Sequence, residues 1–297
     1  MSQFIPVFTS PTGEAACMAA YQTVLDRWPV PYTQCVVPTT YGDTHVIVSG
    51  ADDKPPLVLM HALFASAAVW YPNVGQLSEH FKVYAVDVIG EANRSRPTRP
   101  IKSHDEMADW FRELLDGTGI HQTYLAGNSY GAFMSASYAM RMPERIRRLV
   151  LIGPAATFHP IIPFFLHMFI PKAVCLLLPK LPGRQRIIHH SLRWMYAGLP
   201  KEDAWDRLFY QLMLHGSMTT QILPKVYKKE ELSRIQATTL LLLGDREKIY
   251  RPGAAIRAAR QLMPDLKVKT IPNAHHITAL AQPEIVNQAM IRFFLED

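Results

Sequence analysis

Six short, predominantly apolar runs constrain the fold of this chain more than any other feature of its sequence. They occupy residues 57–60, 83–86, 124–126, 149–152, 240–243 and 268–271. A strand with one wet face alternates apolar and polar residues, whereas a strand buried on both faces, as in a parallel sheet, is apolar throughout. Helical segments separate the runs, at residues 105–115, 131–141, 252–262 and 283–294 among others. This alternation predicts an α/β fold with a mostly parallel central sheet flanked by helices.

The chain before these runs has a different pattern. Residues 13–28 predict a helix, which the prolines that follow would end. Apolar runs at residues 36–37 and 45–48 lie between turn residues and predict a β-hairpin. With these two strands counted, the run at 149–152 is the sixth strand of the sheet.

One long interval breaks the alternation. Residues 153–239 contain no comparable strand and are rich in Phe, Leu, Met, His and Pro, and a loop of this length is uncommon in a compact domain. We therefore predict a helical cap at residues 156–224, inserted after the sixth strand over the carboxyl edge of the sheet. Residues 35–155 and 225–297 then form the core domain, and residues 1–34 form an N-terminal helical extension.

Composition describes an ordinary globular protein. Of the 297 residues, 48% are hydrophobic and 19% charged, which excludes a disordered tail, a coiled coil and a small disulfide scaffold. The net charge of +6 comes from scattered Lys and Arg residues. Nucleic-acid binding would require a basic stripe interleaved with exposed aromatic residues, so we expect no nucleic-acid partner.

Cysteine usage and the first residues bear on location and metal content. Cys17, Cys35 and Cys175 are far apart and form no C-x-x-C pair, which is typical of reduced thiols and gives no zinc-site spacing. The first six residues lack both a basic region and a continuous apolar region. We therefore expect no signal peptide, a cytoplasmic location and no bound metal.

A membrane-like stretch covers residues 161–178. Pro163, Pro171 and Lys172 interrupt it, and a membrane span needs about 20 continuous apolar residues. We interpret it as a buried or pocket-lining helix and expect no stable membrane insertion. The oligomeric state stays open at this point, and a homodimer is compatible with the sequence.

The G-x-S-x-G motif at residues 127–131 is the sharpest candidate for chemistry. It lies between a strand-like run and a helix-like run. In that setting Ser129 occupies a tight strand-to-helix turn, where Gly127 and Gly131 keep Cβ atoms from clashing. The hydroxyl then stands at the carboxyl edge of the sheet, near a helix N-terminus that favours developing negative charge. The motif predicts a nucleophilic serine.

A serine hydroxyl needs a general base, and the base needs a third group that orients it. The last predicted strand is followed by Asn-Ala-His-His at residues 273–276. His275 or His276 would lie over the same sheet edge as the serine. A histidine that merely occupies a surface loop is the plain alternative.

Two carboxylates are candidates for the third group. Asp245 and Glu247 both follow the run at 240–243, whereas the loop after the preceding strand contains no carboxylate. With Glu247 the chain order is Ser129, Glu247, His276, which is the Ser…Asp/Glu…His order of one known fold. The alternative role of Asp245 is to hold the turn or to pair with a nearby arginine.

With these candidates in place, the chain resembles the α/β hydrolases, in the branch of small serine esterases that carry a helical cap. The supporting motifs are His-Ala-Leu-Phe at 61–64, Asp-Val-Ile-Gly at 87–90, the serine turn at 127–131, Met-Pro-Glu-Arg-Ile at 142–146, and Asn-Ala-His-His at 273–276 with Gln-Pro at 282–283. The resemblance covers nearly everything from residue 35 onward and implies the α/β-hydrolase fold. Its register puts the acid on Glu247 and the base on His276.

The resemblance also implies roles around the triad. Backbone N–H groups of Leu63 and Tyr130 would form the oxyanion hole, and His61 would support the loop that carries the first of them. No metal or organic cofactor is implied. The chain departs from the family pattern at Glu247, where aspartate is usual, and at Ala62 and His275, where glycine is common.

The activity implied by the resemblance is hydrolysis of a carboxylic ester through an acyl-enzyme. The aromatic and aliphatic residues of the predicted cap favour a small ester-like substrate with a hydrophobic acyl or aryl part. A carbon–carbon bond hydrolase with the same triad is the alternative enzyme. An alternative of another class is a ligand-binding receptor on a hydrolase scaffold, with little turnover.

Overall fold

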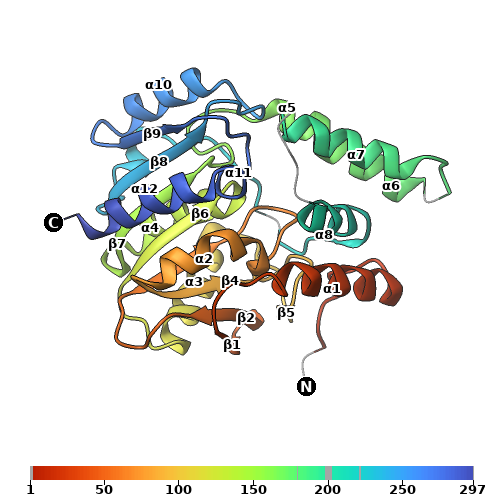
Figure 1. Ribbon diagram of the computed structural model, residues 1–297, viewed down its shortest axis with the longest axis horizontal. Helices are drawn as coiled ribbons and strands as arrows, with labels where there is room; N and C mark the ends of the chain where they lie inside the picture. Colours follow the sequence, from red (N-terminus) through yellow and green to blue (C-terminus); the bar gives the residue numbers. More distant parts are fainter. Residues whose placement is uncertain (1–2, 179, 198–202, 221, 297) are drawn as a thin grey trace.

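One mixed β-sheet organises the chain in the computed structural model, which describes residues 3–178, 180–197, 203–220 and 222–296 (Figure 1). Its strands are β1 (Tyr32–Thr39), β2 (Gly42–Ser49), β3 (Pro56–Met60), β4 (Lys82–Val86), β5 (Arg96–Pro97), β6 (Thr123–Asn128), β7 (Ile146–Ile152), β8 (Thr238–Gly244) and β9 (Lys267–Ile271). The strand order is β1-β2-β4-β3-β6-β7-β8-β9, and the two-residue β5 pairs with β2.

The parallel part of the sheet confirms the prediction from the apolar runs. Strands β4, β3, β6, β7, β8 and β9 pair in parallel, so their carboxyl ends share one edge. The central strands are almost wholly buried, which is why their sequences lack alternation. Strand β9 lies at the sheet border and is mostly exposed, so Lys267 and Lys269 are accommodated there.

The predicted hairpin is also present and is longer than expected. Strands β1 and β2 pair antiparallel from Tyr32 opposite Ser49 to Thr39 opposite Gly42, and β2 pairs antiparallel with β4. Strand β1 is the other border of the sheet and carries polar, exposed residues, which hid its first half in the sequence.

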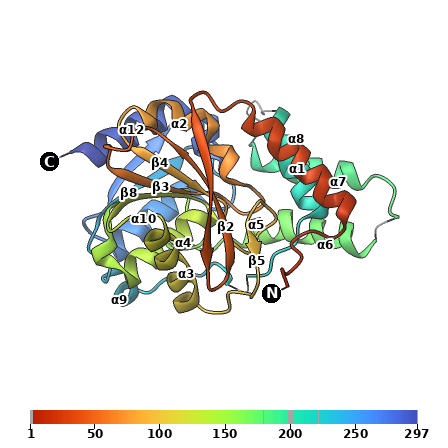
Figure 2. The ribbon, with the colours of Figure 1, turned by 90° about the horizontal axis from the view of Figure 1, so that it is seen from below.

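Helices cover both faces of the sheet. Figure 2 shows α2 and α12 on one face and α3 and α4 on the other. The helices of the core are η1 (Ala67–Trp70), α2 (Tyr71–Ser78), α3 (His104–Gly117), α4 (Tyr130–Arg141), η2 (Pro143–Arg145), α9 (Lys229–Leu232), α10 (Pro252–Leu262), α11 (Thr278–Ala281) and α12 (Pro283–Leu295). Helix α2 is short and contains Pro72 and Gly75, so its sequence carried little helical signal.

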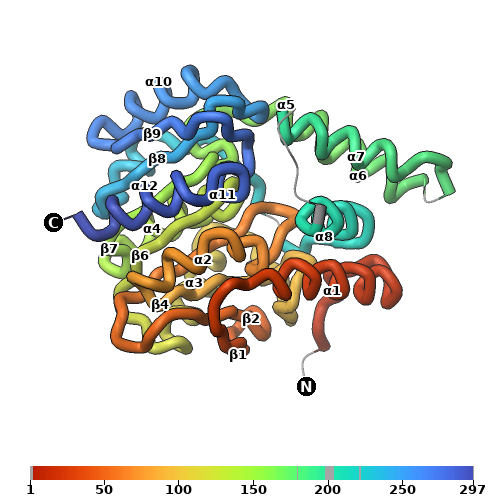
Figure 3. Tube along the Cα trace, viewed as in Figure 1, coloured from red at the N-terminus to blue at the C-terminus, as the bar shows by residue number. Residues whose placement is uncertain are grey.

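Two helical segments lie beyond the carboxyl edge. Between β7 and β8 the chain forms α5 (Ile162–Phe164), a π-type turn η3 (Phe165–Phe169), α6 (Ile170–Leu177), α7 (Arg184–Met195) and α8 (Asp203–His215), a path that can be followed in Figure 3. Helix α1 (Pro11–Leu25) ends three residues earlier than predicted and packs along α8. The domain boundaries themselves stay a prediction, and residues 1–2, 179, 198–202 and 221 of the predicted extension and cap lie outside the described residues.

The segment 161–178 corrects one interpretation. Phe164 and Met168 are buried as expected, but Ile162, Leu166 and Leu177 are more than half exposed. The segment is therefore apolar on its outer face as well as its inner face. None of the described helices is both long enough and apolar enough to cross a membrane.

Gly131 yields a test of how the fold positions the serine turn. A Cβ atom there would lie 2.3 Å from the carbonyl oxygen of Met60 and 2.5 Å from that of His61, and backbone atoms cannot rotate away. We expect Gly131→Ala to lower the free energy of unfolding by about 3 kcal/mol, measured by urea denaturation.

The matched control is Gly253→Ala in the first turn of α10, where the nearest neighbour is the flexible end of Arg257 at 3.6 Å. That substitution should leave stability unchanged or raise it by less than about 1 kcal/mol. Equal stability of the two variants would contradict the packing described for the serine turn.

Candidate active site

Ser129 lies between β6 and α4 with a strained backbone. Its φ of 54° and ψ of −111° fall outside the regions that non-glycine residues favour, at a cost of about 1–3 kcal/mol. Three hydrogen bonds hold it there. The amide of Ser129 donates to Ile152 O at 2.8 Å, and its carbonyl accepts from the amides of Phe133 and Ala155, each at 3.0 Å. The predicted strand–turn–helix geometry is therefore present.

His276 reaches the serine from the loop after β9. Its Nε2 lies 2.8 Å from Ser129 Oγ, and its Nδ1 lies 2.8 Å from Glu247 Oε2. His276 as a residue is 2% exposed, so water competes little for these two hydrogen bonds. Three residues far apart in the chain thus form one continuous hydrogen-bond chain.

Glu247 follows β8 and is held on both carboxylate oxygens. Oε1 accepts hydrogen bonds from the backbone amides of Lys248 at 2.7 Å and Ile249 at 2.9 Å, while Oε2 faces His276. Because a carboxylate only accepts, we assign the Nδ1 proton to His276. Its Nε2 is then free to accept the proton of Ser129 Oγ, which is the tautomer that base catalysis requires.

The two competing candidates occupy structural positions instead. Asp245 Oδ1 accepts from the amide of Ala274 at 3.2 Å, so this carboxylate ties the loop after β8 to the loop after β9. His275 Nδ1 accepts from the amide of Ile277 at 3.1 Å, and its ring lies edge-on to Tyr196 at the end of α7, 4.8 Å between centroids. Neither contacts Ser129 in the way that His276 does.

The two predicted oxyanion donors belong to different elements of the fold. Tyr130 is the first residue of α4, and the first amides of a helix have no acceptor within the helix. Leu63 lies in the loop after β3 and is buried. The hydroxyl of Tyr130 donates to Ile222 O at 2.8 Å, which anchors the returning cap chain to the serine turn.

His61 supports the loop that carries Leu63. Its Nε2 accepts from the amide of Val88 at 3.0 Å, and its Nδ1 lies 2.8 Å from Ala62 O, so the ring joins the loops after β3 and β4. Burial lowers the pKa of this imidazole. Ala62 keeps a negative φ, and the left-handed residue of the loop is Phe64 with φ 56°, so the alanine that replaces glycine fits without strain.

Gly153 is a site residue that sequence analysis missed. It follows β7, which lies between β6 and β8 in the sheet. A Cβ at this position would lie 3.5 Å from His276 Nδ1 and 3.6 Å from Glu247 Oε2. These are ordinary contact distances, so the tighter constraint is the His276 backbone oxygen, 3.3 Å away, together with the φ of 51° at Gly153, which favours glycine. A glycine directly after a buried strand was the available signal.

Glu91 is a second residue that sequence analysis missed. It follows β4, is 2% exposed, and its Oε1 has no hydrogen-bond partner among the described residues. Burial raises the pKa of this carboxyl well above its usual value, while a hydrogen bond from the backbone of Phe64 opposes the shift. This buried carboxyl thus lies beside the loop that holds Leu63. The signal was a carboxylate soon after an apolar strand, at the same sheet edge.

Aromatic side chains from the cap cover the hydrogen-bond chain. The ring of Phe164 lies 6.4 Å from that of His276 and 5.9 Å from that of Phe169. Phe64 packs against Phe169 at 6.0 Å and against Phe209 at 6.1 Å. Ser129 itself is 4% exposed. The nucleophile therefore lies under an apolar cover.

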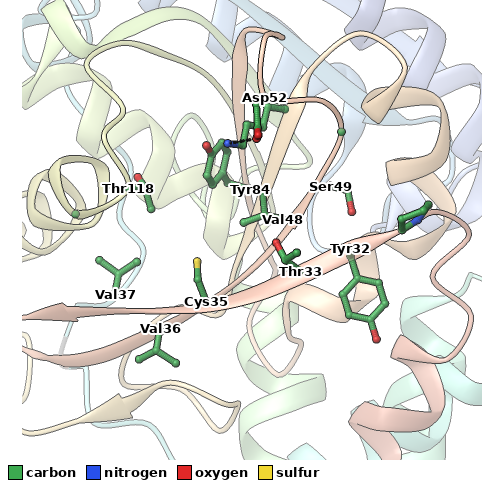
Figure 4. Close-up of a pocket in the computed structure, with 14 residues that line it drawn as sticks. Tyr32, Thr33, Cys35, Val36, Val37, Val48, Ser49, Asp52, Tyr84 and Thr118 are labelled. Atoms are coloured by element: carbon green, nitrogen blue, oxygen red, sulfur yellow. Dashed lines mark ion pairs between the residues drawn. The ribbon is translucent and has the colours of Figure 1, made fainter.

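A separate surface groove lies at the opposite edge of the sheet (Figure 4). Lys82 at the start of β4 forms an ion pair there with Asp52, 2.7 Å between Nζ and Oδ1. The other residues that line this groove include Tyr32, Thr33, Cys35, Val36, Val37, Val48, Ser49, Tyr84 and Thr118. Because the groove lies at the amino end of β4, it has no part in the site.

Among the described residues, no group of three or more His, Cys, Asp or Glu could hold a metal ion.

Comparisons with known proteins agree with this geometry. The family model of the α/β-hydrolase fold matches residues 55–170. An uncharacterized carboxylesterase of Bacillus subtilis (strain 168), nap, is 33% identical over 284 residues, which are 92% of this chain and 90% of that protein. Carboxylesterase YbfK of the same bacterium is 33% identical over 279 residues, 92% of each chain. The crystal structure of naproxen esterase (carboxylesterase NP) from Bacillus subtilis matches with a TM-score of 0.85 at 32% identity, covering 96% of this chain and 99% of that one.

The buried ring of His275 predicts how folding stability changes with pH. Burial lowers the pKa of His275 to about 4, whereas a histidine in the unfolded chain titrates near 6.5. Between these two pH values the unfolded state binds more protons, so folding stability falls as pH falls from 6.5 toward 4. The loss attributable to His275 at pH 5 is about 2 kcal/mol.

The measurement is urea denaturation of the wild type and of His275→Asn at pH 7.5 and pH 5. We expect the wild type to lose about 2 kcal/mol more than His275→Asn between these values. Replacement of the exposed His121 by Asn serves as the control and should leave the loss at its wild-type size. An identical loss in wild type and His275→Asn would contradict the burial of this ring.

Proposed function

Because the chain belongs to the α/β-hydrolase fold family, we propose that it is a serine carboxylesterase whose catalytic triad is Ser129, His276 and Glu247. The observation that carries the proposal is the buried chain of two 2.8 Å hydrogen bonds through His276. The relatives named carboxylesterases, which match nearly the whole chain, support the choice of an ester as substrate.

Acylation begins when Ser129 Oγ attacks the carbonyl carbon of the ester. His276 Nε2 takes the hydroxyl proton as the new C–O bond forms, and the carbonyl π electrons move onto oxygen. The amides of Leu63 and Tyr130 are the proposed donors to this oxyanion. The tetrahedral intermediate then expels the alcohol oxygen. This oxygen takes the proton that His276 Nε2 holds, and an acyl-serine remains.

Deacylation repeats these steps with water. The oxygen of a water molecule attacks the acyl carbon while His276 Nε2 removes a proton from that water. His276 then gives this proton to Ser129 Oγ as the carboxylic acid leaves. Throughout, Glu247 holds the imidazole and stabilises its protonated form. The two backbone amides on Oε1 keep the carboxylate of this longer side chain in place.

A hydrophobic acyl or aryl part is the proposed specificity. The cover over the triad is aromatic, with Phe164, Phe169 and Phe209 from the cap and Phe64 from the oxyanion loop. Such walls favour apolar groups by burying their surface. The cytoplasmic location, the homodimer and the lack of nucleic-acid binding stay predictions from the sequence.

The activity is tested with p-nitrophenyl esters from acetate to decanoate. We expect turnover to rise from acetate toward medium chain lengths, because the aromatic cover binds the longer acyl chain. Ser129→Ala should lower kcat by roughly 10⁴-fold or more, since it removes the nucleophile. The exposed Ser233→Ala is the control and should leave kcat unchanged.

Equal inactivity of wild type and Ser129→Ala on every ester would contradict the proposal. Carbon–carbon bond substrates, and binding of ligands without turnover, would then be the hypotheses to test.

A further inference from the structure

The outer face of the segment from α5 to α6 is apolar and unpartnered within the described residues. Surface helices normally turn polar residues outward, and this segment does not. Its inner side chains include Phe164, Met168 and Cys175, which are buried. The large apolar side chains on its outside are Ile162 (66% exposed), Leu166 (53%), Ile170 (53%), Leu176 (43%), Leu177 (79%) and Leu178 (53%).

The spacing of these residues makes a continuous stripe rather than scattered exceptions. Ile162, Leu166 and Ile170 are four residues apart, and Leu177 continues the row two turns later, so they share one side of the segment. Isolated exposed apolar residues are ordinary, but a contiguous row of this kind marks an interaction surface.

The permanent charges of the hairpin that carries the stripe are of one sign. No Asp or Glu occurs between Glu144 and Glu202, so the whole hairpin formed by α5, α6 and α7 carries no acidic side chain. Its exposed permanent charges are Lys180, Arg186 and Arg193. Figure 1 shows this hairpin extending beyond the sheet, where a large surface can approach it.

We propose that this hairpin docks the protein on an anionic lipid surface. The stripe would lie at the boundary between headgroups and acyl chains, while the basic side chains contact lipid phosphates. The attachment is peripheral, because none of the described helices can cross a membrane. The proposal is independent of the esterase proposal, since it concerns binding alone.

Charge decides between a lipid surface and a second copy of this chain. In a two-fold dimer the same patch meets itself, so the basic side chains of the two hairpins would be brought near each other. Like charges at such an interface cost affinity. An anionic bilayer instead offers an apolar interior and negative headgroups together, which matches both features of the hairpin.

The test is co-sedimentation with vesicles, using Ser129→Ala protein so that lipid esters stay intact. One set of vesicles is phosphatidylcholine alone, and the other contains about 30% phosphatidylglycerol. We expect binding to the anionic vesicles to be at least about tenfold stronger and to weaken at high salt.

Two double variants separate the apolar and the charged parts. Leu166→Glu with Leu177→Glu, and Lys180→Glu with Arg186→Glu, should each weaken binding by about tenfold or more. The control is Val36→Glu on β1, where the side chain is 59% exposed and apolar but lies outside the hairpin. It should bind like the parent protein, and thermal melting should show all three variants folded.

Two results would overturn the proposal. One is binding to anionic vesicles that is absent, or that the stripe variant leaves unchanged. The other is a dimer, seen by light scattering, that Leu166→Glu with Leu177→Glu dissociates, because the stripe would then be an interface between two copies.

Discussion

The buried hydrogen-bond chain from Glu247 through His276 to Ser129 is the interaction on which the rest of the structure depends. Glu247 follows β8, His276 follows β9 and Ser129 follows β6. Strands β8 and β9 are neighbours in the sheet, whereas β7 separates β6 from β8. The chain closes because the parallel strands end at one edge, and Gly153, after β7, packs directly against His276 and Glu247 with a positive φ that favours glycine. The common edge of the sheet thus brings the three side chains within hydrogen-bond distance of one another.

The residues of the site are buried, so hydrogen bonds within the protein must hold them in place. A buried carboxylate loses its hydrogen bonds to water, and other hydrogen bonds must replace them. For Glu247, two backbone amides and His276 provide these bonds. The strained Ser129 backbone is likewise held by bonds to the loop after β7. The same enclosure leaves the serine 4% exposed, with Phe164 of the cap packed against His276.

Much of this arrangement could be predicted from the sequence because its signals are local. The apolar runs gave the parallel strands, and the motif around Ser129 gave the turn. The roles of Glu91 and Gly153, in contrast, depend on which loops meet in space, which a single sequence does not state. The segment 161–178 was interpreted wrongly in part, because an apolar sequence cannot say that Leu166 and Leu177 face outward. Short α2 and the exposed first half of β1 were not predicted, because neither has a clear hydrophobic period.

The central claim is that His276 activates Ser129 for attack on an acyl group. The most direct measurement is labelling with a fluorophosphonate, followed by intact mass and peptide mapping of the wild type, His276→Asn and Ser129→Ala. The account predicts one adduct on Ser129 in the wild type, labelling slowed by at least about a hundredfold in His276→Asn, and none in Ser129→Ala. Labelling of a different residue, or equal labelling rates with and without His276, would contradict it.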